Sequence, residues 1–117
     1  MKVLVCGGRD YANESEVDYQ LGELNCNGRK ITKVIAGAAR GADTLAVRWA
    51  RDEGIPVQEF PANWSKHGKA AGYIRNAEML AQGKPDVVVA FPGGKGTAMM
   101  IKLAEGAGVP VIRAAGW

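Results

Sequence analysis

The sequence predicts an α/β fold with three layers, α/β/α, in which helices cover both faces of a five-stranded parallel sheet. Short β-branched segments alternate with segments of helical periodicity from one end of the 117-residue chain to the other. Glycine-rich turns follow three of the strand segments, and no linker, repeat or change of composition interrupts the alternation. We therefore expect one domain over residues 1–117.

The first strand and helix are predicted by a β-branched run and a helix-start signal. Residues 2–6 form the run, and Asn13 with Glu16 three positions later is close to a capping box. The apolar positions that follow recur at helical spacing: Val17, Leu21 and Leu24. Asn27 and Gly28 tolerate the left-handed conformation and are expected to end this helix.

The second strand, residues 34–36, leads into a glycine loop at 37–43 and a helix from about Thr44. Leu45, Trp49 and Ala50 give this helix its apolar side, and residues 54–56 end it. Residues 57–60 alternate apolar and polar side chains, which is typical of an edge strand.

A third helix is expected from about residue 69 to residue 81, ended by the segment 83–85. We expect Ile74, Ala77 and Ala81 to face the core. The polar side chains of this helix should then point elsewhere: Arg75, Asn76 and Glu78.

The last strands give the order of the sheet. Residues 87–91 are apolar throughout, as in a central strand, and a helix follows at about 97–105. Residues 109–112 form a final strand, in which Pro110 cannot donate to a ladder and so indicates an edge. Edge positions for strands three and five predict the order 3-2-1-4-5, with the winding direction reversing between strands one and four.

This order brings three glycine-rich loops to one edge of the sheet, where ligands of open α/β proteins bind. Small residues let the backbone approach an anion, and the N–H groups of a helix start attract phosphate or carboxylate. Asp43 could cap its helix or bind a sugar hydroxyl, and Arg9 could contact a ligand or pair with Asp10. The expected ligand-binding residues are Gly8, Arg9, Gly37, Ala38, Arg40, Gly41, Asp43, Arg75, Asn76, Pro92, Gly93, Gly94, Lys95, Gly96 and Thr97.

The aromatic side chains that could stack on a base are Trp64, Tyr73 and Tyr11, although Trp64 could equally anchor the packing of its loop. His67 has no partner at catalytic spacing.

Composition narrows the ligand class. The net charge is +3 and the pI is about 9.0, but the basic residues are dispersed, which favours an anionic small molecule over nucleic acid. Cys6 and Cys26 have neither the spacing of a metal site nor that of a disulfide framework. No apolar stretch reaches membrane-spanning length and no signal peptide is recognisable. We expect a cytoplasmic protein without a metal, a cofactor or a membrane partner.

Four motifs in order resemble those of the SLOG superfamily, which includes DprA-type proteins and LOG-type phosphoribohydrolases. They are residues 7–10, 37–43, 72–79 and 91–97, and the likeness is greatest to the small YspA/YpsA-related branch. The resemblance covers essentially the whole chain. It implies a Rossmann-like fold that binds nucleotides or nucleotide-derived ligands along the glycine loops, and pairing into a homodimer.

The sequence differs from the LOG-type hydrolases at one functional position. Their motif is similar to PGGxGTxxE, and its glutamate acts in cleavage of the N-glycosidic bond; here that position is Met100. A thioether cannot accept a proton or stabilise an oxocarbenium ion. Arg75 matches the arginine of those enzymes, and Glu78 or Asp43 would have to replace the glutamate.

The departure favours ligand binding over catalysis as the function. Two alternatives stay open: N-glycosidic hydrolysis with Arg75 and Glu78 as catalytic residues, and DprA-like binding of single-stranded nucleic acid.

Overall fold

A single parallel sheet lies at the centre of the computed structural model, which describes residues 1–26 and 28–117. The strand order is β3-β2-β1-β4-β5, as predicted, and all four neighbouring pairs are parallel. Val3 of β1 lies opposite Val34 of β2 on one side and Val87 of β4 on the other. The strands are β1 (Lys2–Cys6), β2 (Lys33–Ala36), β3 (Val57–Glu59), β4 (Val87–Ala90) and β5 (Val111–Arg113).

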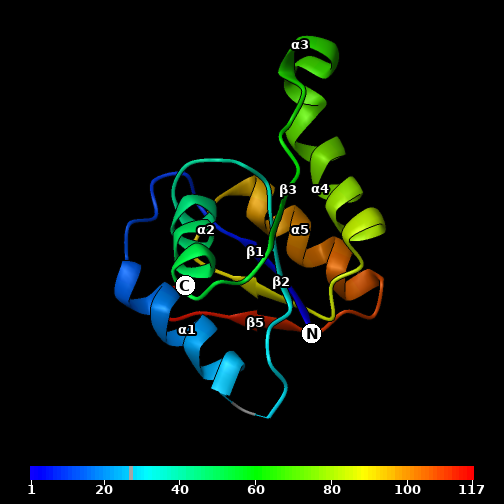
Figure 1. Cartoon of the computed structure of the whole chain (residues 1–117). Helices are drawn as coiled ribbons and strands as arrows, with labels where there is room; N and C mark the ends of the chain where they lie inside the picture. Colours follow the sequence, from blue (N-terminus) through cyan, green and yellow to red (C-terminus); the bar gives the residue numbers. More distant parts are fainter. Residues whose placement is uncertain (27) are drawn as a thin grey trace.

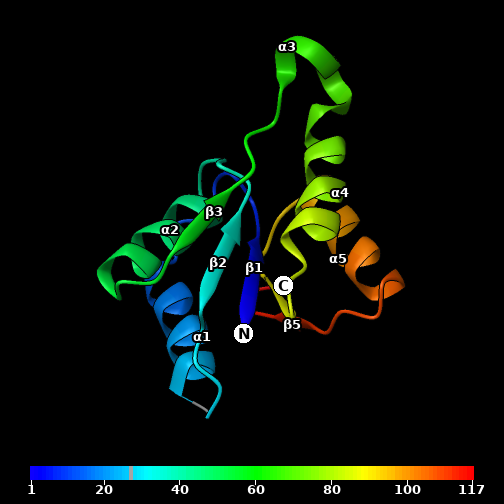
Figure 2. The ribbon, with the colours of Figure 1, turned by 45° about the vertical axis from the view of Figure 1, so that its right-hand side comes forward.

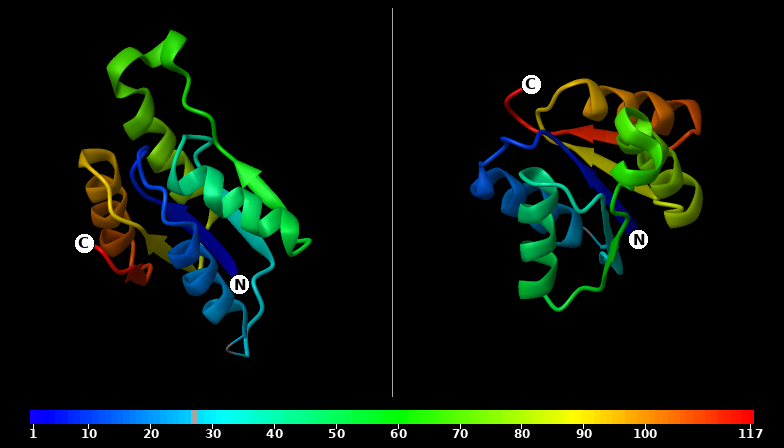
Figure 3. Two further views of the ribbon diagram at one scale, coloured as in Figure 1. Left: turned by 90° about the vertical axis from the view of Figure 1, so that its left-hand side faces the viewer. Right: turned by 90° about the horizontal axis from the view of Figure 1, so that it is seen from above.

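Two layers of helices enclose this sheet (Figures 1 and 2). α1 and α2 cover one face, and α4 and α5 cover the other, which the side and top views of Figure 3 show from two directions. The predicted α/β/α arrangement is therefore confirmed. The helices are α1 (Glu14–Cys26), α2 (Ala42–Asp52), α3 (Trp64–His67), the short 3₁₀ helix η1 (Gly68–Ala70), α4 (Ala71–Gly83) and α5 (Lys95–Gly106).

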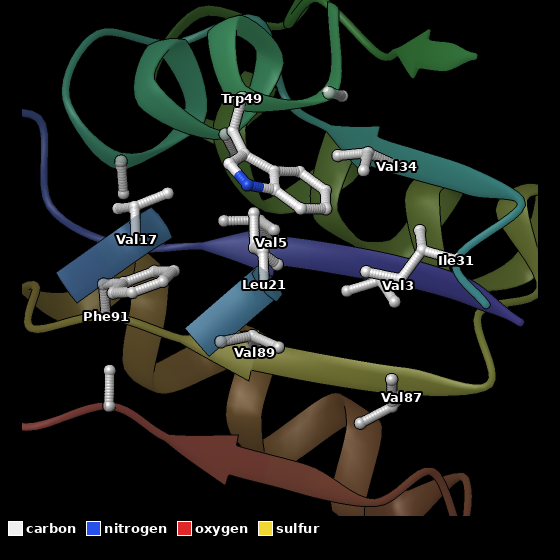
Figure 4. Packing of buried hydrophobic residues seen from close by; sticks show 14 residues of the cluster. Val3, Val5, Val17, Leu21, Ile31, Val34, Trp49, Val87, Val89 and Phe91 are labelled. Atoms are coloured by element: carbon white, nitrogen blue, oxygen red, sulfur yellow. The ribbon is translucent and has the colours of Figure 1, made fainter. Parts of the chain in front are cut away.

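The alternation of side chains along the strands divides the core into two halves. Val3 and Val5 pack with Val17, Leu21 and Trp49 from α1 and α2 on one face (Figure 4). The intervening strand residues pack against α4 and α5 on the other: Leu4, Cys6, Ile35, Val88 and Ala90. Cys6 is a buried core residue, as expected, and burial raises the pKa of its thiol to about 12.

The observed helix boundaries differ from the predicted ones by a few residues near glycines. The Glu16 N–H donates to Asn13 Oδ1 over 3.1 Å, which confirms the expected cap of α1. The predicted end of that helix at Asn27 lies outside the described residues. α2 begins at Ala42 and α5 at Lys95, each two residues earlier than expected, directly after Gly41 and Gly94.

The prolines of the edge strands lie just before those strands. Pro56 and Pro110 precede β3 and β5, and their carbonyl oxygens accept hydrogen bonds from Val34 and Val88. Each proline therefore joins the ladder through its C=O, the group that proline retains.

The predicted inner face of α4 was wrong. Of its three residues, Ala77 and Ala81 are exposed and Ile74 is half-buried, whereas Asn76 and Met79 are buried. Apolarity alone placed Asn76 outside, but its amide forms hydrogen bonds inside the protein, so its burial costs little. Gly83 belongs to the same inner face because a Cβ there would lie 3.0 Å from Ile35 Cδ1.

A helical arm stands clear of the sheet and is formed by α3, η1 and the first turn of α4 (Figures 1 and 2). The sequence predicted only one helix here, from about residue 69; α3 was missed. Asn63 Oδ1 accepts a hydrogen bond from the Lys66 N–H at the start of α3, and α3 packs on η1 and α4. Among the described residues, no helix has both the length and the apolar character needed to cross a membrane.

Candidate functional site

The loops after β1, β2 and β4 touch one another at the carboxyl edge of the sheet. Gly8 N–H donates to Pro92 O over 2.9 Å, and Ala42 N–H donates to Gly8 O over 3.3 Å. Gly41 has φ +77°, and a Cβ on it would lie 2.1 Å from Gly8 O. These direct contacts need glycine, because any side chain at Gly41 would separate the loops.

The turn from β4 into α5 contains two glycines with different surroundings. A Cβ on Gly93 would lie 2.2 Å from Thr97 Oγ1 and 2.7 Å from Gly8 N, so there is no room for a side chain in that direction. Gly94 has no heavy atom within 4 Å of its Cβ direction and stands as the N-cap of α5. Gly94 therefore leaves the start of α5 accessible, and its unpaired N–H groups can receive an anion.

Asp43 holds the loop after β2. Its carboxylate oxygen Oδ2 accepts hydrogen bonds from the N–H groups of Gly37, at 3.1 Å, and Ala39, at 3.3 Å. Asp43 therefore does not cap α2, whose N-cap is Gly41. Burial raises its pKa to about 6, while these two hydrogen bonds and the charge of Arg75 act in the opposite direction.

Arg75 and Asn76 connect α4 to two of the loops, contrary to the expectation that they point away from the core. The Arg75 guanidinium donates to Gly37 O through Nη1 and to Asn76 Oδ1 through Nε, the latter over 3.0 Å. Asn76 Nδ2 donates to Gly96 O over 3.1 Å. This chain of hydrogen bonds links the loop after β2 to the first turn of α5 through the side chains of α4.

A cavity of about 430 Å³ opens where these groups meet. Its rim carries the half-exposed aromatic rings of Trp64 and Tyr73 from the arm. The guanidinium carbon of Arg9 lies 5.4 Å from the centre of the Trp64 ring, a cation–π contact. Of the alternatives weighed for these residues, Trp64 is not a buried packing anchor, and Arg9 contacts Trp64 rather than forming an ion pair with Asp10.

The structure brings ten of the predicted residues to the wall of this cavity: Gly8, Arg9, Asp43, Trp64, Tyr73, Arg75, Asn76, Gly94, Gly96 and Thr97. Three more line a smaller adjoining pocket: Gly37, Ala38 and Arg40. Four belong to the same loops without lining either space: Gly41, Pro92, Gly93 and Lys95.

Two candidates, and the position of the hydrolase glutamate, lie elsewhere. Glu78 is exposed on α4 and does not line the cavity. Tyr11 packs its ring on Phe91, with centroids 5.2 Å apart, so it is not at the site. Met100, at the position of the hydrolase glutamate, is fully buried in the core with Leu4 and Val88.

Seven further wall residues were not among the expected ligand-binding residues, although Gly7 and Ala39 belong to the predicted loops: Val5, Cys6, Gly7, Ala39, Lys69, Gly72 and Met79. The sequence did indicate Gly7, because it directly precedes Gly8 after β1. In the structure, a Cβ added at Gly7 would lie 2.5 Å from Ala42 Cβ. Lys69 and Gly72 belong to the polar stretch that was noted at 64–79. In residues 1–26 and 28–117, no group of three or more His, Cys, Asp or Glu side chains is arranged to hold a metal ion.

The sheet order and the position of the cavity define a Rossmann-like α/β protein with a candidate site at the point where the winding direction reverses. Residues 1–67 match the family model of the YspA, cpYpsA-related SLOG family. The gene 61 protein of Mycobacterium phage D29 is 41% identical to this chain over an alignment 119 residues long. The alignment covers 95% of this chain and 94% of the phage protein. The chain belongs to the YspA, cpYpsA-related SLOG family, and this membership suggests a nucleotide-related function.

Proposed function

We propose that this protein binds a nucleotide-derived ligand, with a phosphate at the start of α5 and the base beside Trp64 and Tyr73. The observation that carries the proposal is the open N-terminus of α5, at which Gly94, Gly96 and Thr97 line a cavity that also holds cationic side chains. A helix start with free N–H groups and adjacent guanidinium groups provides the donors that a phosphate requires.

The charges around the cavity support an anionic ligand. Arg9, Lys69 and Arg75 are cationic, and Asp43 is the one carboxylate among the lining residues. A helix terminus contributes up to about 2 kcal/mol and an arginine hydrogen bond about 1.5–3 kcal/mol, which together support only millimolar affinity once the cost of association is met. Stacking on Trp64 or Tyr73, worth about 1–3 kcal/mol, would bring the affinity into the micromolar range.

Replacement of Gly94 by valine tests the phosphate position. A Cβ at Gly94 has no heavy atom of the fold within 4 Å, so we expect Gly94→Val to keep the melting temperature while covering the N–H groups of α5. A nucleotide that binds the wild type is first identified by thermal-shift screening. We expect Gly94→Val to bind this nucleotide at least about tenfold more weakly than the wild type, measured by calorimetric titration. The control is Gly106→Val, at the other end of α5, where an added Cβ also has no neighbouring heavy atom within 4 Å. Equal affinity in both variants and the wild type would contradict the proposal.

Hydrolysis of an N-glycosidic bond is a second candidate, favoured by Asp43. Its pKa of about 6 would let this carboxyl group act as a general acid toward a departing base near neutral pH. Asp43 would then assume the task that Met100 cannot perform. We expect Asp43→Asn to keep ligand affinity but lose release of free base, measured by chromatography after incubation with nucleoside monophosphates. If the wild type releases no base from any nucleoside monophosphate, this candidate fails and binding alone remains.

A further inference from the structure

A second, smaller pocket of about 240 Å³ adjoins the cavity. Three arginines line it, Arg9, Arg40 and Arg75, and its lining residues include no carboxylate. We propose that the site takes a nucleotide with phosphoryl groups at two separate positions, one at the start of α5 and the other in this arginine pocket. The inference rests on the proposed function and narrows its ligand class.

The two spaces share one wall. Arg9, Ala39, Trp64 and Arg75 line both the cavity and the arginine pocket. Gly94, Gly96 and Thr97 line only the cavity, whereas Arg40 lines only the arginine pocket. A ligand whose middle part lies against Trp64 therefore has the start of α5 on one side and Arg40 on the other.

The lining of the arginine pocket carries three positive charges and no negative one. Arg75 uses Nη1 and Nε for hydrogen bonds to Gly37 and Asn76, which leaves Nη2 available. Burial is the main cause that lowers the pKa of Arg75, the charge of Asp43 acts against burial, and the positive charge of Arg9 lowers the pKa further. Asp43, which lines the cavity, offsets part of the charge of Arg75, and a bound anion in the arginine pocket would offset the repulsion between Arg75 and Arg9 further.

The pocket also has room for a phosphoryl group. Apart from the arginines and Trp64, its walls consist of small residues: Gly37, Ala38, Ala39, Pro61 and Ala62. At Gly37, a Cβ would lie 2.6 Å from Arg75 Nη1, so glycine at this position lets the guanidinium lie against the backbone.

The shared wall discriminates between two ligand classes. The two phosphates of a nucleoside 5′-diphosphate are linked to each other and attached to the sugar at one position, the 5′ oxygen. They would therefore stay together in one of the two pockets. Phosphates on the 5′ and 3′ positions leave the sugar in different directions, so they could reach the start of α5 and the arginine pocket together.

Calorimetric titration with three forms of each common ribonucleoside tests this proposal: the 5′-monophosphate, the 5′-diphosphate and the 3′,5′-bisphosphate. For the base that binds best, we expect the bisphosphate to bind about tenfold more tightly than either other form, the value of one charge-assisted hydrogen bond. In Arg40→Gln, this advantage should fall to about twofold or less. Arg40 is exposed, so the variant should fold. Arg113→Gln, which removes an exposed arginine that lines neither space, should keep the full advantage.

The outcomes separate this inference from the function on which it rests. If the monophosphate and bisphosphate bind equally, or if Arg40→Gln and Arg113→Gln behave alike, the arginine pocket does not receive a phosphoryl group, while nucleotide binding stands. A 5′-diphosphate that matches the bisphosphate would also overturn the inference. If no form binds to the wild type, the proposed function and the inference both fail.

Discussion

Gly93 and Gly94 are neighbours in the sequence, yet the structure uses their missing side chains for different purposes. Gly93 lets Thr97 and Gly8 pack against the turn, and Gly94 faces open space at the start of α5. We expect Gly93→Ala to lower the free energy of unfolding by about 1–3 kcal/mol, the usual cost of forcing a methyl group into a packed site. Urea unfolding measures the effect, with Gly94→Ala as the matched control that should keep wild-type stability.

Asp43 gives the protein a predictable response to pH. Burial raises its pKa from 3.8 in the unfolded chain to about 6 in the folded protein, so the folded state binds the proton more tightly. Unfolding then releases a proton between about pH 4 and pH 6, and the contribution of Asp43 to the free energy of unfolding falls as the pH rises through this window.

Comparison with Asp43→Asn isolates this contribution, because asparagine does not titrate but can still accept from Gly37 and Ala39. The wild type should lose stability relative to the variant, by up to about 3 kcal/mol, as the pH rises from about 4 to about 6. Urea unfolding at several pH values measures the difference. A stability difference that stays constant over this range, or that rises with pH, would contradict the assignment.

At the residue scale, the sequence located the loops but not the task of each residue in them. Glycines after apolar strands were sufficient to indicate the three turns. Whether a glycine faces a cavity or a neighbouring backbone depends on contacts such as that of Gly41 with Gly8, which join distant parts of the chain. Met100, which the sequence analysis gives as unsuited to proton transfer, lies in the core.

At the scale of the element, α4 shows where apolar periodicity misleads. Its inner face consists of small residues, one methionine and a hydrogen-bonded asparagine, whereas the alanines that the pattern placed inside are exposed. A polar residue can lie inside when its partners are supplied by other elements, and those partners cannot be read from the helix itself. The strands were easier to predict, because residues buried on both faces form continuous apolar runs.

The corrected face of α4 can be tested by mutation. Met79→Ala removes a side chain that is 2% exposed and should lower the free energy of unfolding by about 2 kcal/mol or more. Ala77→Lys, on the exposed side, should change it by no more than about 0.5 kcal/mol. Thermal melting of both variants distinguishes the two faces, and a larger loss for Ala77→Lys would restore the original orientation.

At the scale of the whole molecule, salt should affect ligand binding and stability differently. The ion pairs Arg48–Glu14 and Arg51–Glu59 span 3.8 Å between exposed side chains, so screening them should hardly move the melting temperature. The cavity collects cationic groups on a chain of net charge +3. Raising NaCl from about 0.05 M to about 0.5 M should therefore weaken nucleotide binding by about threefold or more, measured by calorimetry. Affinity independent of salt would point away from phosphate recognition.

The order of the five strands followed from the sequence because edge and central strands differ in composition, and because the parallel crossovers leave few arrangements. The arm was not predicted. Most of its residues are exposed and no apolar periodicity runs through them, so no pattern indicates where Trp64 would lie, although this ring lines both the cavity and the arginine pocket.

The arm and the glycine loops are under different evolutionary constraints. The glycine loops are fixed at the edge of the sheet, where a single extra methyl group at Gly41 or Gly93 would collide with backbone. α3 packs chiefly on η1 and α4, and can change its sequence with little effect on the core. Under the proposed function, relatives that share the loops would differ in base preference through residues 61–73, and grafting that segment between them should transfer the preference.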